Sequence, residues 1–461
     1  TSNYRFTKDL NLMVRLGYNV YSNTETWRNP SANIYSTRGG WNAKGRYSIT
    51  KAWGWETDND VILSYNRKFG KLTLDVMTGG NINRIVDESL SAGTRNGLTS
   101  PTFFSLAGSV EPPTISPGYS TRQVNSLYGR GSIGWNNAVF LDITGRNDWH
   151  SAQPADNRDY FYPSLGASVV LSEIWRLPAL IDMWKVRGSW TTFKTPAGTY
   201  DINRLYSTTT AAWNTLNAAS YPSNLLGSDL LPSSARTWEI GTAAYLFKKR
   251  FHIDLAYFNK YYYNQQRSVS IPNSSGFSST LINWDETYVR KGLEITLDGS
   301  LIKRKNFEWH STVNWSNQHR YYVDLDSVYS AKDLWTKKGE RLDGYIDYYW
   351  LRDPSGNVIH NNGYPMESDY TKRYGFTDPD FSFGFINRFT IGNFLVGLNI
   401  DGRIGGLMYN YVYDKMWDTG TNPESDNPYR YDEVVNGLTN YVGTGVKVVS
   451  GDVTYDNFGN I

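Results

Sequence analysis

The sequence has 461 residues, enough for one large domain or several small ones, and its 46 basic and 44 acidic side chains nearly cancel. This balance argues against a nucleic-acid partner, which needs a basic surface. Cysteine is absent, which excludes disulfide scaffolds and cysteine-based metal or nucleophile sites. The mean hydropathy is -0.52, and no run approaches the roughly 18 apolar residues of a membrane helix.

Apolar and polar residues alternate along much of the chain, which indicates β-strands because successive side chains of a strand point to opposite faces. Residues 44–53 resemble a further strand, but we assign them to a loop because another crossing would place two short links in succession. Residues 172–184 alone hint at a turn of helix, and Pro178 would interrupt it. We predict strands at residues 10–20, 60–69, 71–85, 122–135, 138–147, 160–171, 183–193, 236–247, 251–271, 288–301, 306–318, 379–390 and 394–405.

The lengths of these strands and of their links predict a membrane-spanning barrel. A tilted strand crosses a bilayer in ~9 to 11 residues, which most of the predicted strands reach. Short links, as at residues 136–137 and 391–393, alternate with long ones, of which 319–378 is the longest. Short turns of such barrels face the periplasm and long loops face the outside. The expected fold is therefore all-β: an antiparallel up-and-down transmembrane β-barrel with long extracellular loops.

The number of predicted strands is odd, whereas single-chain bacterial barrels normally have an even number and must close to leave no edge in lipid. We therefore expect strand partners from outside these residues. The first residues also lack a signal-peptide pattern, so the start is read as a cut within a longer chain.

Several blocks of sequence, taken in order, resemble one family of transporters. They are "GRNDW" before "YFYPSLGASVVLSE", "MWKVRGSWTTFKTP", "LLPSSARTWEIGTAAYLFKKRFHIDLAYFNKYYYN", "VRKGLEITLDGSLIKRKNFEWHSTVNWSNQ", "TDPDFSFGFINRFTIGNFLVGLNIDGRIGG" and "GVKVVSGDVTYDNFGNI". The series resembles the barrel of the SusC/RagA family of TonB-dependent outer-membrane transporters of Bacteroidota. The resemblance implies that residues 1–461 form one partial domain of a 22-stranded barrel, without the plug domain and the last strands.

The same resemblance implies a function and partners. Members of this family import a large nutrient, most often an oligosaccharide or a peptide, across the outer membrane. A SusD-like surface lipoprotein caps the barrel from outside, and the TonB complex acts on the plug from inside. The expected surroundings are membrane lipid and lipopolysaccharide, and no cofactor is expected.

Charged residues recur on the polar side of the alternation. They are too costly to face lipid and are expected to face the lumen, where their mixed signs suggest cross-strand pairing and contact with a plug. These residues are Arg15, Asp142, Arg146, Lys185, Arg187, Glu239, Asp254, Glu294, Asp298, Glu308, Arg388, Asp401 and Arg403.

Aromatic residues fall into two groups. Those near strand ends suit a girdle at the lipid headgroups, although ordinary β-propensity accounts for about half of them: Trp135, Trp184, Trp238, Phe307, Trp309, Phe381 and Phe394. Those in loops could stack on a sugar or peptide ligand, or could form small loop cores instead: Trp213, Trp335, Tyr348, Tyr349, Trp350 and Trp417.

No catalytic triad, paired-carboxylate site or metal-ligand cluster stands out, so we predict no enzyme and no metal site. Two other functions stay open. A passive porin or secretion channel is favoured if the full gene encodes no plug. A soluble β-rich glycan-binding or adhesin module would extract into buffer without detergent. A lipase or protease built into a barrel is the weakest alternative.

Overall fold

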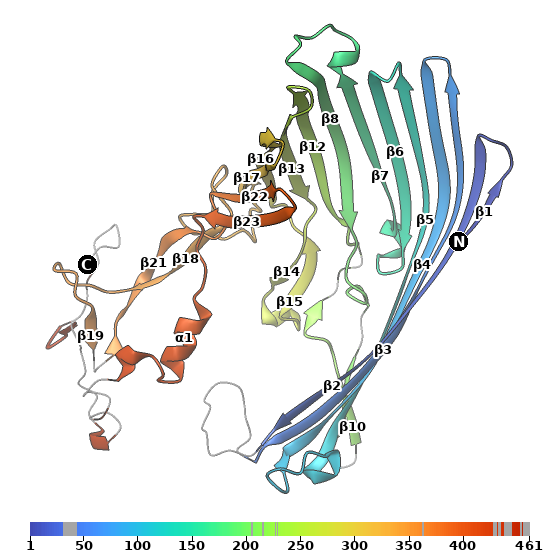
Figure 1. Ribbon diagram of the computed structural model, residues 1–461. Helices are drawn as coiled ribbons and strands as arrows, with labels where there is room; N and C mark the ends of the chain where they lie inside the picture. The colour runs from blue at the N-terminus through green and yellow to red at the C-terminus, as the bar shows by residue number, and fades with distance from the viewer. Residues whose placement is uncertain are drawn as a thin grey trace. The chain divides into compact units, whose positions relative to one another are not determined.

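The computed structural model describes residues 1–30, 44–203, 206–213, 216–225, 227, 229–361, 364–426, 431, 435–437, 445–451 and 454. They form two compact units. The first comprises Thr1–Thr287 with Asp324–Ser330, and the second Tyr288–Val323 with the described residues after 330. Antiparallel strands dominate both units (Figure 1). No helix in the described ranges is long and apolar enough to cross a membrane.

The main sheet of the first unit pairs strands in chain order, each antiparallel to its neighbours. Its described strands are β1 (Ser2–Arg5), β2 (Leu10–Asn29), β3 (Arg46–Phe69), β4 (Leu72–Leu98), β5 (Ser109–Trp135), β6 (Val139–His150), β7 (Asp159–Val170), β8 (Ile181–Thr195), β12 (Ser233–Leu246) and β13 (Phe251–Tyr263). Strands β2 to β5 are 20 to 27 residues long, and Figure 1 shows them continuing past the ends of β6 and β7.

Smaller elements occupy the links of the first unit. One two-stranded sheet joins β9 (Ser207–Trp213) to β10 (Leu216–Ser220). A three-stranded sheet contains β11 (Asn224–Leu225), β14 (Gln266–Ser270) and β15 (Ser279–Asn283). Short 3-10 helices are η1 (Leu106–Gly108), η2 (Ala155–Asn157), η3 (Leu171–Glu173) and η4 (Asn273–Ser275).

The second unit repeats the long-strand pattern and carries a large loop region. Its main strands, in order, are β16 (Thr287–Arg304), β17 (Phe307–Asp324), β22 (Phe381–Ile391) and β23 (Phe394–Ile404). Between β17 and β22 lie a hairpin of β18 (Gly344–Trp350) with β21 (Glu367–Phe376), and the short strands β19 (Ile359–Asn361) and β20 (Tyr364–Pro365). After β23 come α1 (Tyr411–Asp418), η5 (Pro423–Ser425) and β24 (Val446–Lys447), which pairs with β19.

Each of the thirteen predicted strands overlaps an observed long strand, and two predictions were wrong. Residues 46–53 are not loop but the first part of β3, which runs on without a break to Phe69, so no extra crossing arises. Residues 251–271 are two strands, β13 and β14. The turn of helix suggested at the start of 172–184 is present as the 3-10 turn η3, and β8 begins at Ile181.

The predicted short links are tight turns. Asn136 and Asn137 join β5 to β6 with φ of 52° and 55°. Two successive positive φ values match the type I′ hairpin turn, and asparagine tolerates that conformation better than most residues. Gly392, in the link between β22 and β23, has φ of 56°. These turns fix the register of the strands on either side.

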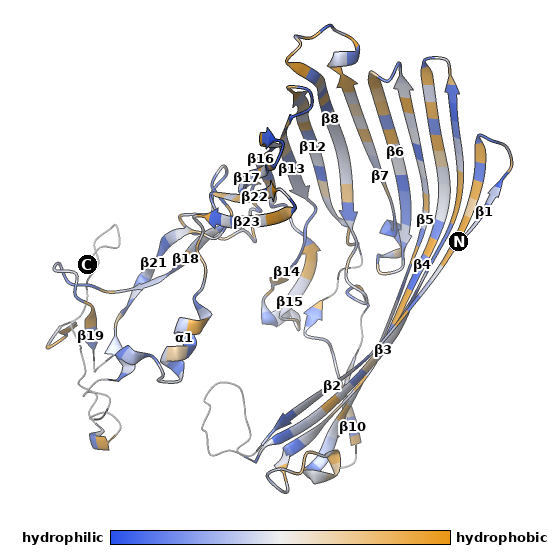
Figure 2. Ribbon diagram, in the orientation of Figure 1, coloured by the Kyte–Doolittle hydropathy of each residue, from blue (hydrophilic) through white to orange (hydrophobic). Residues whose placement is uncertain are grey.

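The two faces of each sheet differ in polarity. In β23, Val396 lies opposite Phe389 of β22, and Ile400 lies opposite Phe385. Leu398 is two residues from each and therefore shares their face. Leu398 is 49% exposed although it is aliphatic. Bands of opposite hydropathy alternate along the strands in Figure 2. Exposed aliphatic rows of this kind suit contact with hydrocarbon, since soluble proteins bury theirs.

Leu398→Arg tests this assignment of faces. A cation at mid-bilayer on the lipid side costs ~2 to 4 kcal/mol, so we expect the protein expressed from its own gene to fail in membrane assembly. Asp401→Asn, on the opposite face of the same strand, should assemble normally. Heat-modifiable migration on gels measures assembly, and equal behaviour of the two variants would contradict the assignment.

Candidate functional site

A row of polar residues crosses six strands of the first unit on the face opposite the aliphatic rows. Arg15 lies opposite Asp60, Asp60 opposite Asn81, Asn81 opposite Ser126, Ser126 opposite Asp148, and Asp148 opposite Tyr160. All except Arg15 are buried. Buried polar groups must find partners within the protein. This row therefore forms the buried centre of the polar face.

Asp60 is the most connected member of the row and is only 4% exposed. Its Oδ2 accepts hydrogen bonds from Nε and Nη2 of Arg15, at 2.9 and 2.5 Å. Its Oδ1 accepts from Asn81 Nδ2 at 2.9 Å and from the Tyr128 hydroxyl at 3.1 Å. Four donors on one carboxylate tie β2, β3, β4 and β5 together through side chains as well as through the backbone.

A second centre lies on β6. Arg146 donates from Nε to Asp148 at 2.7 Å and from Nη2 to the Ser126 hydroxyl at 2.7 Å. The Tyr162 hydroxyl of β7 also donates to Asp148. Because the Arg146 guanidinium lies 5.5 Å from the Tyr128 ring centroid, the two centres form one network from β2 to β7.

Gly79 makes room for this network. It lies opposite Tyr128, and a Cβ there would come within 2.9 Å of the tyrosine ring and 2.8 Å of the Val61 carbonyl oxygen. Glycine at position 79 therefore lets the Tyr128 ring lean across β4 towards Asp60 on β3. Gly241 makes room for the guanidinium of Arg187 in the same way. A Cβ at position 241 would lie only 2.7 Å from Arg187 Cζ.

Four of the five other charged residues predicted on β6 to β13 pair across strands, and the fifth, Lys185, lies opposite Ala243. Arg187 donates two hydrogen bonds to Asp254, at 2.9 and 2.8 Å, and lies 3.5 Å from Glu239. Asp142 accepts from Arg130 at 3.1 Å. The predicted cross-strand pairing is thus present, and within this unit these residues share one face by strand register.

In the second unit the predicted charged residues also share one face, with fewer contacts. Asp298 accepts hydrogen bonds from His310, at 2.8 Å, and Thr312, at 2.6 Å, and His310 lies opposite Arg388. Glu294, Arg388, Asp401 and Arg403 are exposed and have no ion-pair partner among the described residues. That these faces line a lumen remains a prediction.

The contacts of His310 resemble a Ser-His-Asp arrangement without its chemistry. Ser300 Oγ is 3.3 Å from His310 Nδ1, and Asp298 bonds the other ring nitrogen. However, the Ser300 hydroxyl donates to Glu308 at 2.8 Å, so its proton is directed away from the histidine. A nucleophilic serine needs the base to accept that proton. This cluster is better described as a polar network.

A groove of about 400 Å³ lies on the polar face near the far ends of β2 to β5. Trp27, Ser48, Gly93 and Thr114 form one cross-strand row in it, and Thr50, Ser91 and Ser116 form the next. Trp27 is 56% exposed. Arg46 also lines the groove and has no acidic partner in the part of the chain that the structure describes.

These residues were missed because both strands were predicted too short. The prediction ended the first strand at residue 20 and placed residues 44–53 in a loop, whereas β2 continues to Asn29 and β3 begins at Arg46. Beyond the aliphatic rows, residues 21–29 are polar on both faces, so the alternation that marks a lipid-facing strand disappears. The β-branched Thr24 and Thr26 beside Trp27 were the remaining signal of extended structure.

Comparison with known proteins identifies the family. A family model described as "TonB dependent receptor-like, beta-barrel" matches residues 1–432. The chain belongs to this family. Receptors of the family lie in the outer membrane of Gram-negative bacteria.

Two curated relatives come from Formosa agariphila. TonB-dependent receptor P26 is 26% identical over 424 residues, which cover 82% of this chain and 42% of the relative. TonB-dependent receptor P3 is 21% identical over 462 residues, covering 92% of this chain and 46% of the relative. The receptor chain thus spans less than half the length of these relatives.

A solved structure supports the fold. The RagAB peptide transporter superposes with a TM-score of 0.73 at 15% identity, covering 87% of this chain and 46% of that one. At this identity the likeness concerns the fold alone. It confirms the predicted fold class of an antiparallel β-barrel and, with the family match, the resemblance to SusC/RagA proteins.

The predicted ligand-binding aromatics belong to several different elements. Tyr348, Tyr349 and Trp350 share β18, where Tyr348 and Trp350 are exposed. Trp335 lies under Arg373, whose guanidinium is 4.7 Å from its ring, and Trp417 packs edge-on against Tyr413 in α1. Trp213 belongs to β9, but its side chain lies outside the described residues. Their role in ligand binding remains a prediction.

The long loop of the receptor is anchored at its base by paired charges. Arg341 donates to both oxygens of the buried Asp343, at 3.0 and 2.7 Å, and Arg320 donates to both oxygens of Asp378, at 3.0 and 3.1 Å. Burial opposes ionisation of Asp343, but Arg341 and the Asp378 amide outweigh it and lower the pKa of this carboxyl. Among the described residues no group of three or more potential metal ligands assembles.

A second loop anchor contains Glu286, whose pKa is raised, whereas the pKa of Asp343 is lowered. Glu286 is buried and accepts a hydrogen bond of 2.6 Å from the Ser330 hydroxyl. Nearby Asp326 accepts from the amides of Val328 and Tyr329 at 2.8 and 2.9 Å. Burial, followed by the charge of Asp326, raises the pKa of Glu286 against the opposing effects of Ser330 and Arg267.

Gly79→Ala tests the polar network. The new methyl group must displace the Tyr128 ring or the β3 backbone, and overpacking of this kind costs ~1 to 3 kcal/mol. We expect a lower thermal unfolding midpoint of the purified receptor in detergent. Gly131→Ala is the matched control, since a Cβ at Gly131 meets nothing within 4 Å. Equal midpoints for the two variants would contradict the role given to Gly79.

The raised pKa of Glu286 predicts how the second anchor responds to pH. Glu286 binds its proton more strongly in the folded loop than in the open loop. Protonation of Glu286 therefore stabilises the folded loop fully below the ordinary pKa of 4.5, and this stabilisation is lost as the pH rises through the raised pKa of the folded loop. Hydrogen exchange at residues 326–330, corrected for intrinsic rates, should report easier opening at pH 8 than at pH 5.

Glu286→Gln keeps an oxygen for Ser330 and removes the buried charge. We expect exchange in this variant to be slower at pH 8 and nearly independent of pH, whereas Glu367→Gln on exposed β21 should behave as wild type. A pH dependence that persists in Glu286→Gln would show that another group is responsible.

Proposed function

We propose that this chain forms part of the barrel wall of an outer-membrane transporter that imports a large nutrient with energy from the TonB complex. The observation that carries the proposal is the division of the long strands into an aliphatic face and a polar face, whose central charges are paired from β2 to β7. A polar wall with satisfied charges lets a hydrophilic solute pass without holding it tightly. Membership in the TonB-dependent receptor-like family supports this function.

The proposed substrate class is an oligosaccharide or a peptide. The groove near the ends of β2 to β5 supports a first contact on this chain, because Trp27 offers an exposed ring and Thr50, Ser91 and Ser116 offer hydroxyl groups. Such groups suit flat, polar ligands that combine apolar faces with hydroxyl or amide edges. The RagAB structure, described as a peptide transporter, is a relative in fold only.

The proposed partners are a SusD-like surface lipoprotein outside and the TonB complex inside. The hairpin of β18 and β21 supports the first, because it exposes the aromatic residues Tyr345, Tyr348, Trp350, Tyr370 and Tyr374. Aromatic side chains are enriched in protein interfaces. The TonB complex would act through a plug domain of the complete receptor, as the resemblance to SusC/RagA proteins implies.

Uptake measurements separate this function from passive diffusion. A strain that carries the native gene should take up its labelled nutrient, and deletion of tonB or addition of a protonophore should abolish uptake. A passive porin would continue to admit the nutrient under both conditions. Trp27→Ala should weaken uptake at low nutrient concentration by ~5 to 160-fold, the loss of ~1 to 3 kcal/mol of ring contact. Uptake that is independent of TonB would contradict the proposal.

A further inference from the structure

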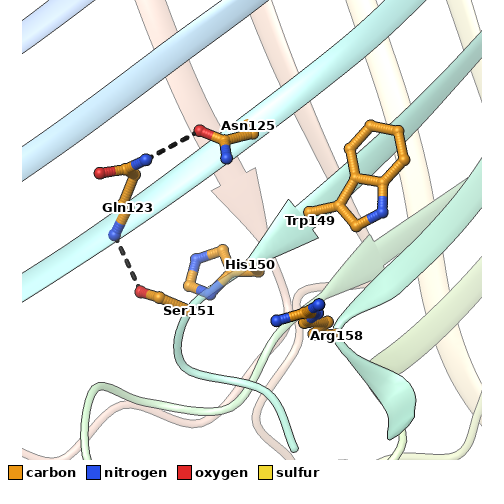
Figure 3. A pocket seen from close by; sticks show the side chains of 6 residues that line it. All are labelled: Gln123, Asn125, Trp149, His150, Ser151 and Arg158. Carbon is orange, nitrogen blue, oxygen red and sulfur yellow. Dashed lines mark hydrogen bonds between the residues drawn. The ribbon is translucent and has the colours of Figure 1, made fainter. Parts of the chain in front are cut away.

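A polar pocket lies at the end of β6 in the first unit, where Gln123, Asn125 and Trp149 continue the aliphatic face by strand register and His150 belongs to the polar face. Its volume is about 400 Å³, and it is lined by Gln123, Asn125, Trp149, His150, Ser151 and Arg158. Figure 3 shows Gln123 and Asn125 on one side, Trp149 on the other and Arg158 below them. These residues come from β5, the end of β6 and the link to β7.

Strand register places the mouth of this pocket beside the proposed lipid surface. Asn125 lies directly opposite Trp149, and Leu127, two residues farther along β5, belongs to the same face. Leu127 lies in one cross-strand row with Phe161 of β7, and both are exposed. The step between Asn125 and Leu127 is only ~7 Å along the strand. The polar pocket therefore borders the aliphatic rows directly.

Strand length places the pocket at the edge of the hydrocarbon layer. Trp149 is the residue before the last in β6, a strand of 12 residues that begins at the tight turn after β5. A tilted strand needs ~9 to 11 residues to cross the bilayer, so Trp149 reaches the far boundary when the turn lies at the near one. Tryptophan is enriched at this level. With the short turns facing the periplasm, this boundary is that of the outer leaflet.

The pocket is suited to an anion. No acidic side chain lines it, and Arg158 is exposed without an acidic partner in the described ranges. Gln123 Nε2 donates to Asn125 Oδ1 at 2.9 Å, which leaves the Asn125 amide nitrogen without a hydrogen-bond partner among the described residues. The Trp149 indole N–H is a further donor on the pocket wall. A guanidinium and two N–H groups form a donor set of the kind that binds phosphate oxygens.

We propose that this pocket binds the phosphorylated headgroup of an outer-leaflet glycolipid whose acyl chains lie along Leu127, Phe161 and the neighbouring aliphatic rows. The proposal rests on the proposed membrane setting, since it needs the aliphatic face to contact lipid. Arg158 neutralises the phosphate, Asn125 and Trp149 bind its oxygens or the adjoining sugar, and the volume is within the range of ligand pockets. One lipid would thereby be held at the joint between β5 and the β6–β7 hairpin.

The test is lipid binding to the receptor expressed from its native gene. The purified receptor is placed in phosphatidylcholine nanodiscs that contain either diphosphorylated or dephosphorylated lipid A, and bound lipid is counted by native mass spectrometry. We expect one diphosphorylated lipid per receptor and weaker retention of the dephosphorylated form. Inorganic phosphate at millimolar concentration should leave the lipid bound. Displacement by phosphate alone would overturn the lipid assignment.

Matched variants locate the site. Arg158→Gln should weaken retention of the phosphorylated lipid at least tenfold, and Arg158→Lys should restore most of it. Arg176→Gln, an exposed cation in the link between β7 and β8, should bind as wild type. Heat-modifiable migration checks that each variant is folded. Unchanged lipid retention in folded Arg158→Gln would overturn the site.

Nutrient uptake, measured on the same variants, separates this inference from the proposed function. Uptake by Arg158→Gln should remain dependent on TonB, because Arg158 is not among the residues that line the polar groove. TonB-independent uptake in wild type would contradict the proposed function and leave the lipid measurement as a separate result.

Discussion

A strand that separates hydrocarbon from water must satisfy opposite demands on its two faces. On one face the side chains must be apolar, and on the other every charge that becomes buried needs a partner. Asp60 illustrates the second demand, because its carboxylate accepts bonds from Arg15, Asn81 and Tyr128. Leu398 illustrates the first, since it stays exposed on the aliphatic face. The fold, the proposed transport and the lipid pocket all depend on this division.

The paired polar face has a consequence for transport. A buried carboxylate that has four donors is not available to bind a passing solute, so the centre of the wall is rigid and passive. Exposed groups lie instead near the far ends of β2 to β5, where Trp27 and Arg46 line a groove and the hydroxyl groups of Thr50 and Ser91 bond each other. In the proposed transport, recognition and passage would thereby be separated along the strands, with exposed groups beyond the aliphatic rows and satisfied groups between them.

The strands could be predicted from the sequence only where one face is a continuous row of apolar residues, as contact with lipid requires. Between Leu10 and Val20, or between Phe394 and Ile404, strict alternation is required, and the predicted strands overlap the observed ones. Residues 21–29 and 46–53 lack the aliphatic alternation, so the period-two signal is weak and the prediction failed there. The hairpin of β18 and β21, the helix α1 and the short β1 were missed because local loop contacts determine them. Cross-strand pairs such as Arg187 with Asp254 depend on register, which periodicity alone does not give.

The division between the two faces can be measured most directly on β23 with single cysteines, because the sequence contains none. The variants Leu398→Cys, Asn399→Cys, Ile400→Cys and Asp401→Cys are each treated in intact outer membranes with a charged, water-soluble maleimide. Labelling should alternate, with residues 399 and 401 reactive and residues 398 and 400 protected by lipid. Uniform labelling of all four positions, or protection of 399 and 401, would contradict the account.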